Sequence, residues 1–271
     1  MSDRNDQIEL ATLVVGVTGH RKLREAEIPA LRAQVRDFLL DLQRRYPELP
    51  VLLLSSLAEG GDQLAAQVAL DLGLRVTAPL PMAVELYRDD FDDVSRPVFD
   101  RQLQQVEALV LPLRHDSHHD AIAQPGLARD QQYAQAGIFV SSHCHILLAL
   151  WDGGDSHKLG GTAQVVRFHL QGSVPGQIDR RRRVALARLG LDEDTLVYHL
   201  QANREDHTDE DRADGVSQPG RWLTADEDIV AHDLLPPAFD LMFQRQAEFN
   251  ADVRKYSPAI RDFSTSSCSD A

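Results

Sequence analysis

Several short loops combine glycine with polar or charged side chains, and their residues are the best suited to chemistry. Where glycine begins a helix, backbone N–H groups can approach an anion, and the helix adds a partial positive charge. Gly160-Gly161-Thr162 fits this phosphate-binding pattern best, because Thr162 can cap the following helix and offer a hydroxyl, while Arg21 supplies a countercharge. The candidate ligand-binding residues are Thr18, Gly19, His20, Arg21, Glu59, Gly60, Gly61, Asp62, Leu80, Pro81, Trp151, Asp152, Gly153, Gly160, Gly161 and Thr162.

Two of these residues, Glu59 and Asp152, are carboxylates that could also be catalytic. A carboxylate in such a loop either accepts hydrogen bonds from ribose hydroxyls or transfers protons, and the residues alone leave both roles open. Trp151 and Tyr87 are candidates for stacking on a base, although Trp151 also ends a buried strand. A single glycine pair is more often an ordinary tight turn, but its recurrence at several strand ends favours a site.

These loops need strands that end at one edge of a sheet, and the apolar pattern predicts such strands. Helical periodicity separates the strands, first over residues 28–46, then after Asp62, across Val98 to Val106, over 131–142 and after Thr162. The stretch from His115 to Ala128 has no period and predicts a surface loop. This alternation predicts a Rossmann-like, doubly wound, mostly parallel sheet with helices on both faces. The expected strands are 13–17, 51–54, 75–80, 109–113, 146–151 and 196–200.

The chain divides into three parts by composition. Residues 1–204 form the expected Rossmann-like domain, and the acidic, polar residues 205–221 are expected to be a linker or long loop. Residues 222–271 predict a helical C-terminal appendage that includes Ile229 and Leu235 and ends in a frayed tail. Its apolar positions either pack on the sheet domain, form a contact between identical chains, or lead toward a further domain.

Composition excludes several classes of function. The 271 residues carry 28 Lys+Arg against 42 Asp+Glu, a net charge of −14, so the field of the protein repels nucleic acid and anionic lipid. Two cysteines are too few for a disulfide framework, and no apolar run is long enough to span a bilayer, so we expect a soluble, cytoplasmic protein. Neither GxGxxG after the first strand nor GxxxxGK[ST] occurs, which argues against a dinucleotide dehydrogenase and a P-loop nucleotidase.

Histidines and arginines gather in three places without a binding pattern. His115, His118 and His119 lie in the predicted loop, and His143-Cys144-His145 precedes a strand, but neither group has zinc-ligand spacing. No metal site is therefore expected. The basic run at residues 180–183 is most simply solvated surface, although it could close over a phosphate.

Together, the ordered motifs resemble the SLOG superfamily, a Rossmann-like group that includes DprA-type proteins and lysine-decarboxylase-like phosphoribohydrolases. The similarity runs from about residue 12 to residue 204. It is carried by Val15-Gly-Val-Thr-Gly-His-Arg21, Leu57-Ala-Glu-Gly-Gly-Asp62, Ala78-Pro-Leu-Pro81 with Tyr87 and Asp90-Phe91, Ala149-Leu-Trp-Asp-Gly153, and Gly160-Gly-Thr162.

The resemblance implies a nucleotide or nucleotide-derived ligand and no firm cofactor beyond it. In some branches it implies a sensor in bacterial conflict systems that is often fused to a membrane or effector module, so an effector is an expected partner. The hydrolase branch has a glutamate shortly after its Gly-Gly-x-Gly-Thr motif, whereas Gln164 stands here, and a glutamine amide is a poor proton-transfer group. We therefore expect binding or sensing. The alternatives are a phosphoribohydrolase or N-glycosidase using Glu59 or Asp152, and an assembly subunit that oligomerises through its C-terminal helices.

Overall fold

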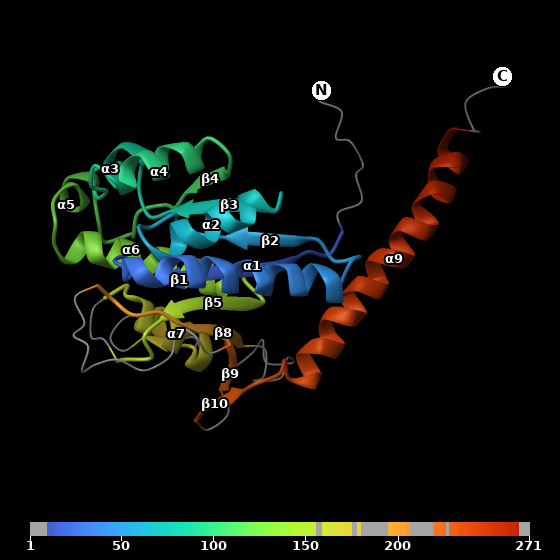
Figure 1. Ribbon diagram of the computed structural model, residues 1–271. Coiled ribbons are helices and arrows are strands. Elements are labelled where there is room, and N and C mark those ends of the chain that lie inside the picture. The colour runs from blue at the N-terminus through green and yellow to red at the C-terminus, as the bar shows by residue number, and fades with distance from the viewer. Residues whose placement is uncertain are drawn as a thin grey trace, which may run out of the picture.

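The computed structural model describes residues 10–155, 159–174, 178–179, 195–205, 219–225 and 228–265, and these residues form an α/β fold. Its centre is an eight-stranded sheet in the order β10-β9-β8-β5-β1-β2-β3-β4 (Figure 1). The predicted Rossmann-like, mostly parallel sheet is confirmed. Its parallel strands are β1 (Leu13–Gly19), β2 (Val51–Leu54), β3 (Arg75–Leu80), β4 (Glu107–Val110), β5 (Ile146–Trp151) and β8 (Leu196–Gln201).

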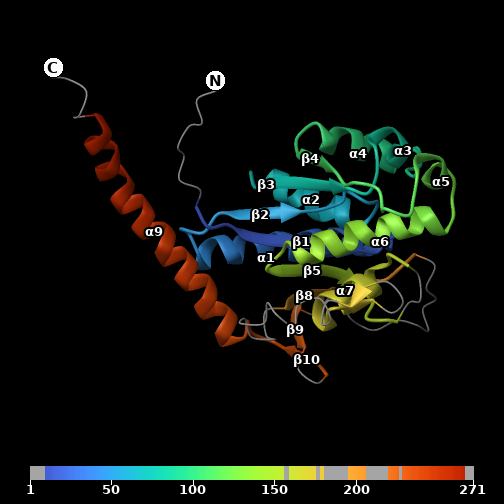
Figure 2. The same ribbon diagram turned by 180° about the vertical axis from the view of Figure 1, so that it is seen from behind.

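Helices cover both faces of this sheet, and alternate residues of each central strand face opposite cores. In β5, Ile146, Leu148 and Leu150 join the core that includes α1 (Ile28–Arg45) and α2 (Gly61–Asp71), whereas Leu147 and Ala149 join the core that includes α6 and α7. Figures 1 and 2 show α1 in front of the sheet in one view and α6 and α7 in front in the opposite view. Burial of strand residues on both faces explains why β2 and β5 are almost wholly apolar.

The remaining helices flank this framework. Two short helices follow β3, α5 packs on α6, and α9 completes the described chain, which confirms the predicted C-terminal helix. A short 3-10 helix, η1 (Glu25–Glu27), precedes α1, and β6 (Ser173–Val174) pairs with β7 (Ile178–Asp179) outside the main sheet. The flanking and second-face helices are α3 (Val84–Arg88), α4 (Ser95–Leu103), α5 (His119–Ala123), α6 (Leu127–Ser142), α7 (Thr162–Gln171) and α9 (Pro237–Thr265).

Helix α1 shows how the sequence specifies one of these layers. Its buried residues Leu31, Val35, Phe38, Leu39 and Leu42 recur every three or four positions, so they share one side of the helix. Burial of each such side chain contributes on the order of 1.5–3 kcal/mol. The helix therefore packs on the sheet through this stripe, as its periodicity predicts.

The structure corrects several expected elements. The helical interpretation of residues 222–235 is wrong, because β9 (Arg221–Ala225) and β10 (Ile229–His232) are antiparallel strands that extend the sheet beyond β8. The loop expected from His115 to Ala128 contains α5 and the start of α6. Helix α4 ends at Leu103, and β4 lies at residues 107–110 rather than 109–113. Residues 206–218 of the expected linker lie outside the described part of the chain.

Candidate ligand-binding site at the carboxyl edge of the sheet

Strand order places a switch point between β1 and β5. From β1 the chain builds outward through β2, β3 and β4, and it then returns to the other side of β1 to place β5 and β8. The crossovers on the two sides of a switch point run in opposite directions, which leaves a crevice beyond the carboxyl ends of the two strands. The loops singled out from the sequence after β1, β2, β3 and β5 all follow the carboxyl ends of parallel strands and so share this edge.

Glycines at the end of β1 and in the turn after β2 are needed because these two segments touch. A Cβ on Gly19 would lie 2.7 Å from the Cα of Gly61, and a Cβ on Gly60 would lie 2.2 Å from the carbonyl oxygens of His20 and Arg21. Gly60 also has a φ of 85°, which favours glycine. The N–H of Gly61 donates to the carbonyl oxygen of His20 at 3.0 Å. These glycines therefore close the backbone of one loop on the other, and the N–H of Gly61 is already paired.

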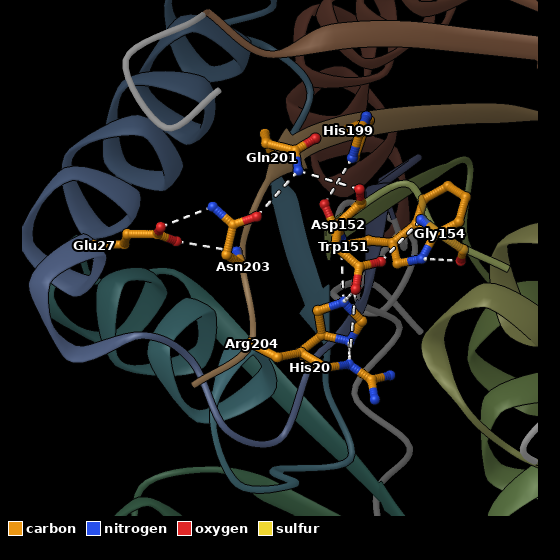
Figure 3. A network of polar contacts seen from close by, with 9 residues as sticks. All are labelled: His20, Glu27, Trp151, Asp152, Gly154, His199, Gln201, Asn203 and Arg204. Carbon is orange, nitrogen blue, oxygen red and sulfur yellow. Dashed lines mark hydrogen bonds and ion pairs between the residues drawn. The ribbon is translucent and has the colours of Figure 1, made fainter. Parts of the chain in front are cut away.

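At the switch point, His20, Asp152 and Arg204 form a polar cluster (Figure 3). The Nε2 atom of His20 lies 3.1 Å from Oδ2 of Asp152, and Nε of Arg204 donates to Nδ1 of His20 at 3.3 Å. The backbone N–H of Asp152 also donates to Nε2 of His20 at 3.1 Å, so both ring nitrogens of His20 are engaged. His20 is only 3% exposed, whereas the Arg204 side chain is 33% exposed. The cluster thus fixes Asp152 and leaves part of the Arg204 side chain accessible.

Residues of the β8 carboxyl end hold this cluster in place. Gln201 donates from Nε2 to the carbonyl oxygen of Asp152 at 3.1 Å. The buried carboxylate of Glu27 accepts from the backbone N–H of Asn203 at 3.0 Å and from its Nδ2 at 2.8 Å (Figure 3). Leu23 and Arg204 form an antiparallel bridge between the same two segments. Arg204 is therefore positioned by a network of hydrogen bonds that begins before α1.

The loop after β5 is closed by its own side chains. The Asp152 Oδ1 atom accepts from the N–H of Gly154 at 2.9 Å, and the indole N–H of Trp151 donates to the carbonyl oxygen of Gly154 at 3.0 Å. Gly153 has a φ of 80°, as the tight turn requires. His199 donates from Nε2 to the carbonyl oxygen of Trp151, and burial lowers the pKa of His199. Trp151 is thus half-buried and held against its own loop.

Asp62 anchors the turn between β2 and α2 from inside. Its side chain is buried, and burial raises the pKa of its carboxyl to about 7, although hydrogen bonds from the backbone of Gly19, Ser56 and Ala58 oppose this shift. Three backbone donors converge on one carboxyl group, which explains an acidic residue in this apolar place. Asp62 therefore organises the β1 and β2 loops.

Arg21 and Glu59 lie above that turn and are more accessible. The Nε atom of Arg21 is 3.9 Å from Oε2 of Glu59, and its Nη2 donates to the carbonyl oxygen of Asp90 at 3.2 Å. The side chains of Arg21 and Glu59 are 45% and 21% exposed. Partial burial raises the pKa of Glu59, although Arg21 opposes this shift. An accessible cation thus stands beside a carboxylate that binds protons more readily than usual.

The segment after β3 is joined to α6 by an ion pair between the buried Arg129 and the partly buried Asp90. Arg129 donates to Asp90 Oδ1 at 2.8 Å, to the hydroxyl of Tyr133 and to the carbonyl oxygens of Leu86 and Ile122. Asp90, which the sequence placed among the family motifs, is consequently a structural partner of Arg129.

Other candidates after β3 are also buried. Leu80 and Pro81 are buried, and the Tyr87 ring packs 5.1 Å from that of Phe91 and 5.5 Å from that of Phe99. In the described structure, these side chains belong to the core.

The loop before α7 differs from its expected geometry. The N-cap residue is Gly161, without a side-chain cap, so the capping role expected for Thr162 is wrong. Oε1 of Gln164 accepts from the N–H of Gly160 at 2.6 Å. Gly160 has a φ of 71°, and a Cβ there would lie 2.9 Å from the backbone nitrogen of Ala134 in α6. Gln164 thus accepts the hydrogen bond of the N–H group that was expected to face a phosphate.

The described residues contain no group of three or more His, Cys, Asp or Glu side chains suited to a metal ion. His143 stacks on Phe139, and His145 accepts from the N–H of Val14 at 3.0 Å. Burial lowers the pKa of His145. The basic run at residues 180–183 lies outside the described residues. In the part of the chain that is described, no helix has the length and apolar character needed to cross a membrane.

Sequence reasoning missed Glu27, Gln201, Asn203 and Arg204. The rule that identified the other loops applies equally to the end of the strand at 196–200, so it could have pointed to residues 201–204. Glu27 had no such signal, because its contact with Asn203 joins positions 176 residues apart.

Comparison with known proteins adds little beyond the fold. No family model matches the chain, and no curated protein matches it. Among solved structures, the chain is similar to the X-ray structure of DNA processing protein A (DprA) from Streptococcus pneumoniae, with 14% sequence identity and a TM-score of 0.32. The match covers 51% of this chain and 41% of the DprA chain, which is less than half of that chain's length.

Proposed function

We propose that the protein binds a nucleotide or nucleotide-derived ligand at the switch point between β1 and β5. The observation that carries this proposal is the cluster of His20, Asp152 and Arg204, which lies where open α/β sheets bind ligands. The ordered motifs that resemble the SLOG superfamily support the same class of ligand. In this proposal the ligand is a signal that the protein senses, and an effector is its downstream partner.

The charges at this edge of the sheet suggest how such a ligand would be held. Arg21 and Arg204 are both partly exposed, and guanidinium groups form paired hydrogen bonds with phosphate oxygens. Asp152 and Glu59 are acceptors for ribose hydroxyls. Because Gln164 occupies the N–H of Gly160, the two arginines replace the loop before α7 as the main phosphate contacts.

A second candidate function is hydrolysis of an N-glycosidic bond, with Glu59 transferring the proton. Its raised pKa and partial exposure favour this role for Glu59 over Asp152, which is held by His20 and the N–H of Gly154. A general acid works best when its pKa approaches the working pH. Binding remains the preferred function because Gln164 stands where the hydrolase branch has glutamate.

Thermal unfolding with mononucleotides, cyclic nucleotides and ADP-ribose tests both functions, and each mixture is then chromatographed for released base. A ligand at about one hundred times its dissociation constant stabilises the protein by about 2.7 kcal/mol. Arg204→Gln should weaken the affinity at least about tenfold. Arg75→Gln is the matched control, because Arg75 is 79% exposed at the opposite edge of the sheet.

Three outcomes separate the alternatives. A rise in the unfolding temperature without release of a base supports binding. Base release that is lost in Glu59→Gln supports the hydrolase instead. No shift and no release with any of these compounds would refute both functions.

A further inference from the structure

Helix α9 crosses the end of the molecule opposite the candidate site. Its inner side carries the buried residues Phe239, Phe243 and Asn250. Nδ2 of Asn250 donates to the carbonyl oxygens of Ala11 and Glu48 at 2.8 Å each, and its Oδ1 accepts from the N–H of Ala11. These contacts fix α9 across the amino-terminal ends of β1 and β2, as both views show (Figures 1 and 2).

The outer side of α9 carries large apolar side chains that face solvent. Leu241, Phe249 and Tyr256 are 53%, 56% and 56% exposed. Leu241, Phe249 and Tyr256 are eight and seven positions apart, which is about two helical turns each time, so these side chains lie on one side of the helix. Three further residues lie on the same side of the helix. We call the whole set the outer stripe, and it consists of Ala238, Leu241, Arg245, Phe249, Asp252 and Tyr256.

A shallow hollow of about 530 Å³ adjoins the outer stripe. Leu241, Met242 and Phe249 line it together with Ala11, and its walls are mainly apolar. Exposed large apolar side chains beside an apolar hollow are typical of an interaction surface.

The order of charged and apolar residues along the outer stripe indicates which partner binds there. Arg245 and Asp252 stand at equal distances on either side of the point between Glu248 and Phe249, and so do Leu241 and Tyr256. When two copies of α9 pair antiparallel about that point, Arg245 of each copy faces Asp252 of the other, and Leu241 faces Tyr256. A surface that complements itself in this way fits a two-fold symmetric contact.

We propose that the outer stripe of α9 joins two copies of this chain in an antiparallel homodimer. Tyr256 of one copy packs beside Leu241, at the hollow of the other. In each copy Arg245 binds Glu248 at 3.1 Å, and both side chains are more than 60% exposed, so exchanging this weak pair for Asp252 of the second copy costs little. The stretch from Leu241 to Tyr256 spans about 24 Å, so we expect a small interface with micromolar affinity.

Sedimentation velocity over about 1–200 µM protein tests the dimer, and the expected mass rises from one chain of 30.2 kDa toward twice that value. Phe249→Glu should give a monomer throughout. Ala251→Glu is its matched control, because it adds the same charge at an exposed position of the same helix outside the stripe, and it should still dimerise. Circular dichroism verifies that each variant is folded.

Charge reversal tests the antiparallel register. Arg245→Asp and Asp252→Arg should each weaken the dimer at least about tenfold, and the double variant should restore it, because both cross-pairs reappear with reversed sign. A monomer at every concentration, or a folded double variant that stays as weak as the single ones, would overturn the proposal. The first result would mean that another part of this chain or a different protein covers the stripe.

Discussion

The buried carboxyl of Asp62 should make the stability of the protein depend on pH in an unusual direction. Its pKa rises from an ordinary value of 3.8 to about 7 because burial penalises the charged form. An acid whose pKa is higher in the folded state contributes stability that is fully present below its unfolded pKa and is lost as pH rises through the folded pKa. The window for Asp62 therefore runs from about pH 4 to about pH 7.

The size of the effect follows from the shift. One pKa unit corresponds to about 1.4 kcal/mol, so the free energy of unfolding should fall by on the order of 4 kcal/mol across the window through Asp62 alone. Between pH 5 and pH 7 the expected loss is about 2–3 kcal/mol. In Asp62→Asn this dependence disappears, while the variant is less stable overall because its amide NH₂ faces backbone donors.

Urea unfolding at pH 5, 6, 7 and 8 measures this prediction as the difference in slope between the wild type and Asp62→Asn. Other groups that titrate contribute equally to both proteins and cancel. Asp71→Asn is the control, because Asp71 ends the same helix on the surface and should leave the slope unchanged. Parallel pH profiles for the wild type and Asp62→Asn would refute the reasoning.

Three further substitutions should each disturb the contacts of one residue. Glu27→Gln should lower the free energy of unfolding by about 2–3 kcal/mol in urea titrations, because its NH₂ group faces one of the two Asn203 donors. Arg129→Lys should cost a similar ~2–3 kcal/mol, since an ammonium cannot reach Asp90 and both carbonyl oxygens together; an unchanged urea midpoint would contradict this role. Gly60→Ala should prevent folding, seen as loss of the circular dichroism of the wild type, because its Cβ would lie 2.2 Å from two carbonyl oxygens.

The sequence was sufficient for the parallel sheet because its strands are apolar on both sides. The bounds predicted for β2, β3 and β5 agree with the structure, and each of these strands is followed by a turn signal. The start of α6 was missed because Arg129, a charged residue with 5% exposure, faces inward and interrupts the apolar period. Strands β9 and β10 were missed because they form by pairing at the sheet edge, β9 with β8 and β10 with β9, and short strands there have little periodicity of their own.

The site was only partly predictable for a similar reason. Ligands of parallel sheets bind beyond the carboxyl ends of the strands, and this rule identified His20 and Asp152. Their contact at 3.1 Å follows from the neighbouring positions of β1 and β5. The roles of Gln164 and Glu27 depend on side-chain contacts that no local pattern reveals. Local patterns thus located the edge of the sheet, whereas packing decided which donors there are already paired.

The contact between Gly19 and Gly61 limits how this protein could diverge. The end of β1 and the start of α2 approach so closely that a larger residue at Gly19 or Gly61 would collide with the backbone of the other segment, so neither position accepts a side chain. The segment after β8 contacts its neighbours through a backbone hydrogen bond from Ala202 to Trp151 and through the side chains of Gln201 and Arg204, and these side chains can be exchanged while the backbone contact is kept. New ligand preferences would therefore arise by substitution at positions such as Gln201 and Arg204, while the backbone that carries them stays the same.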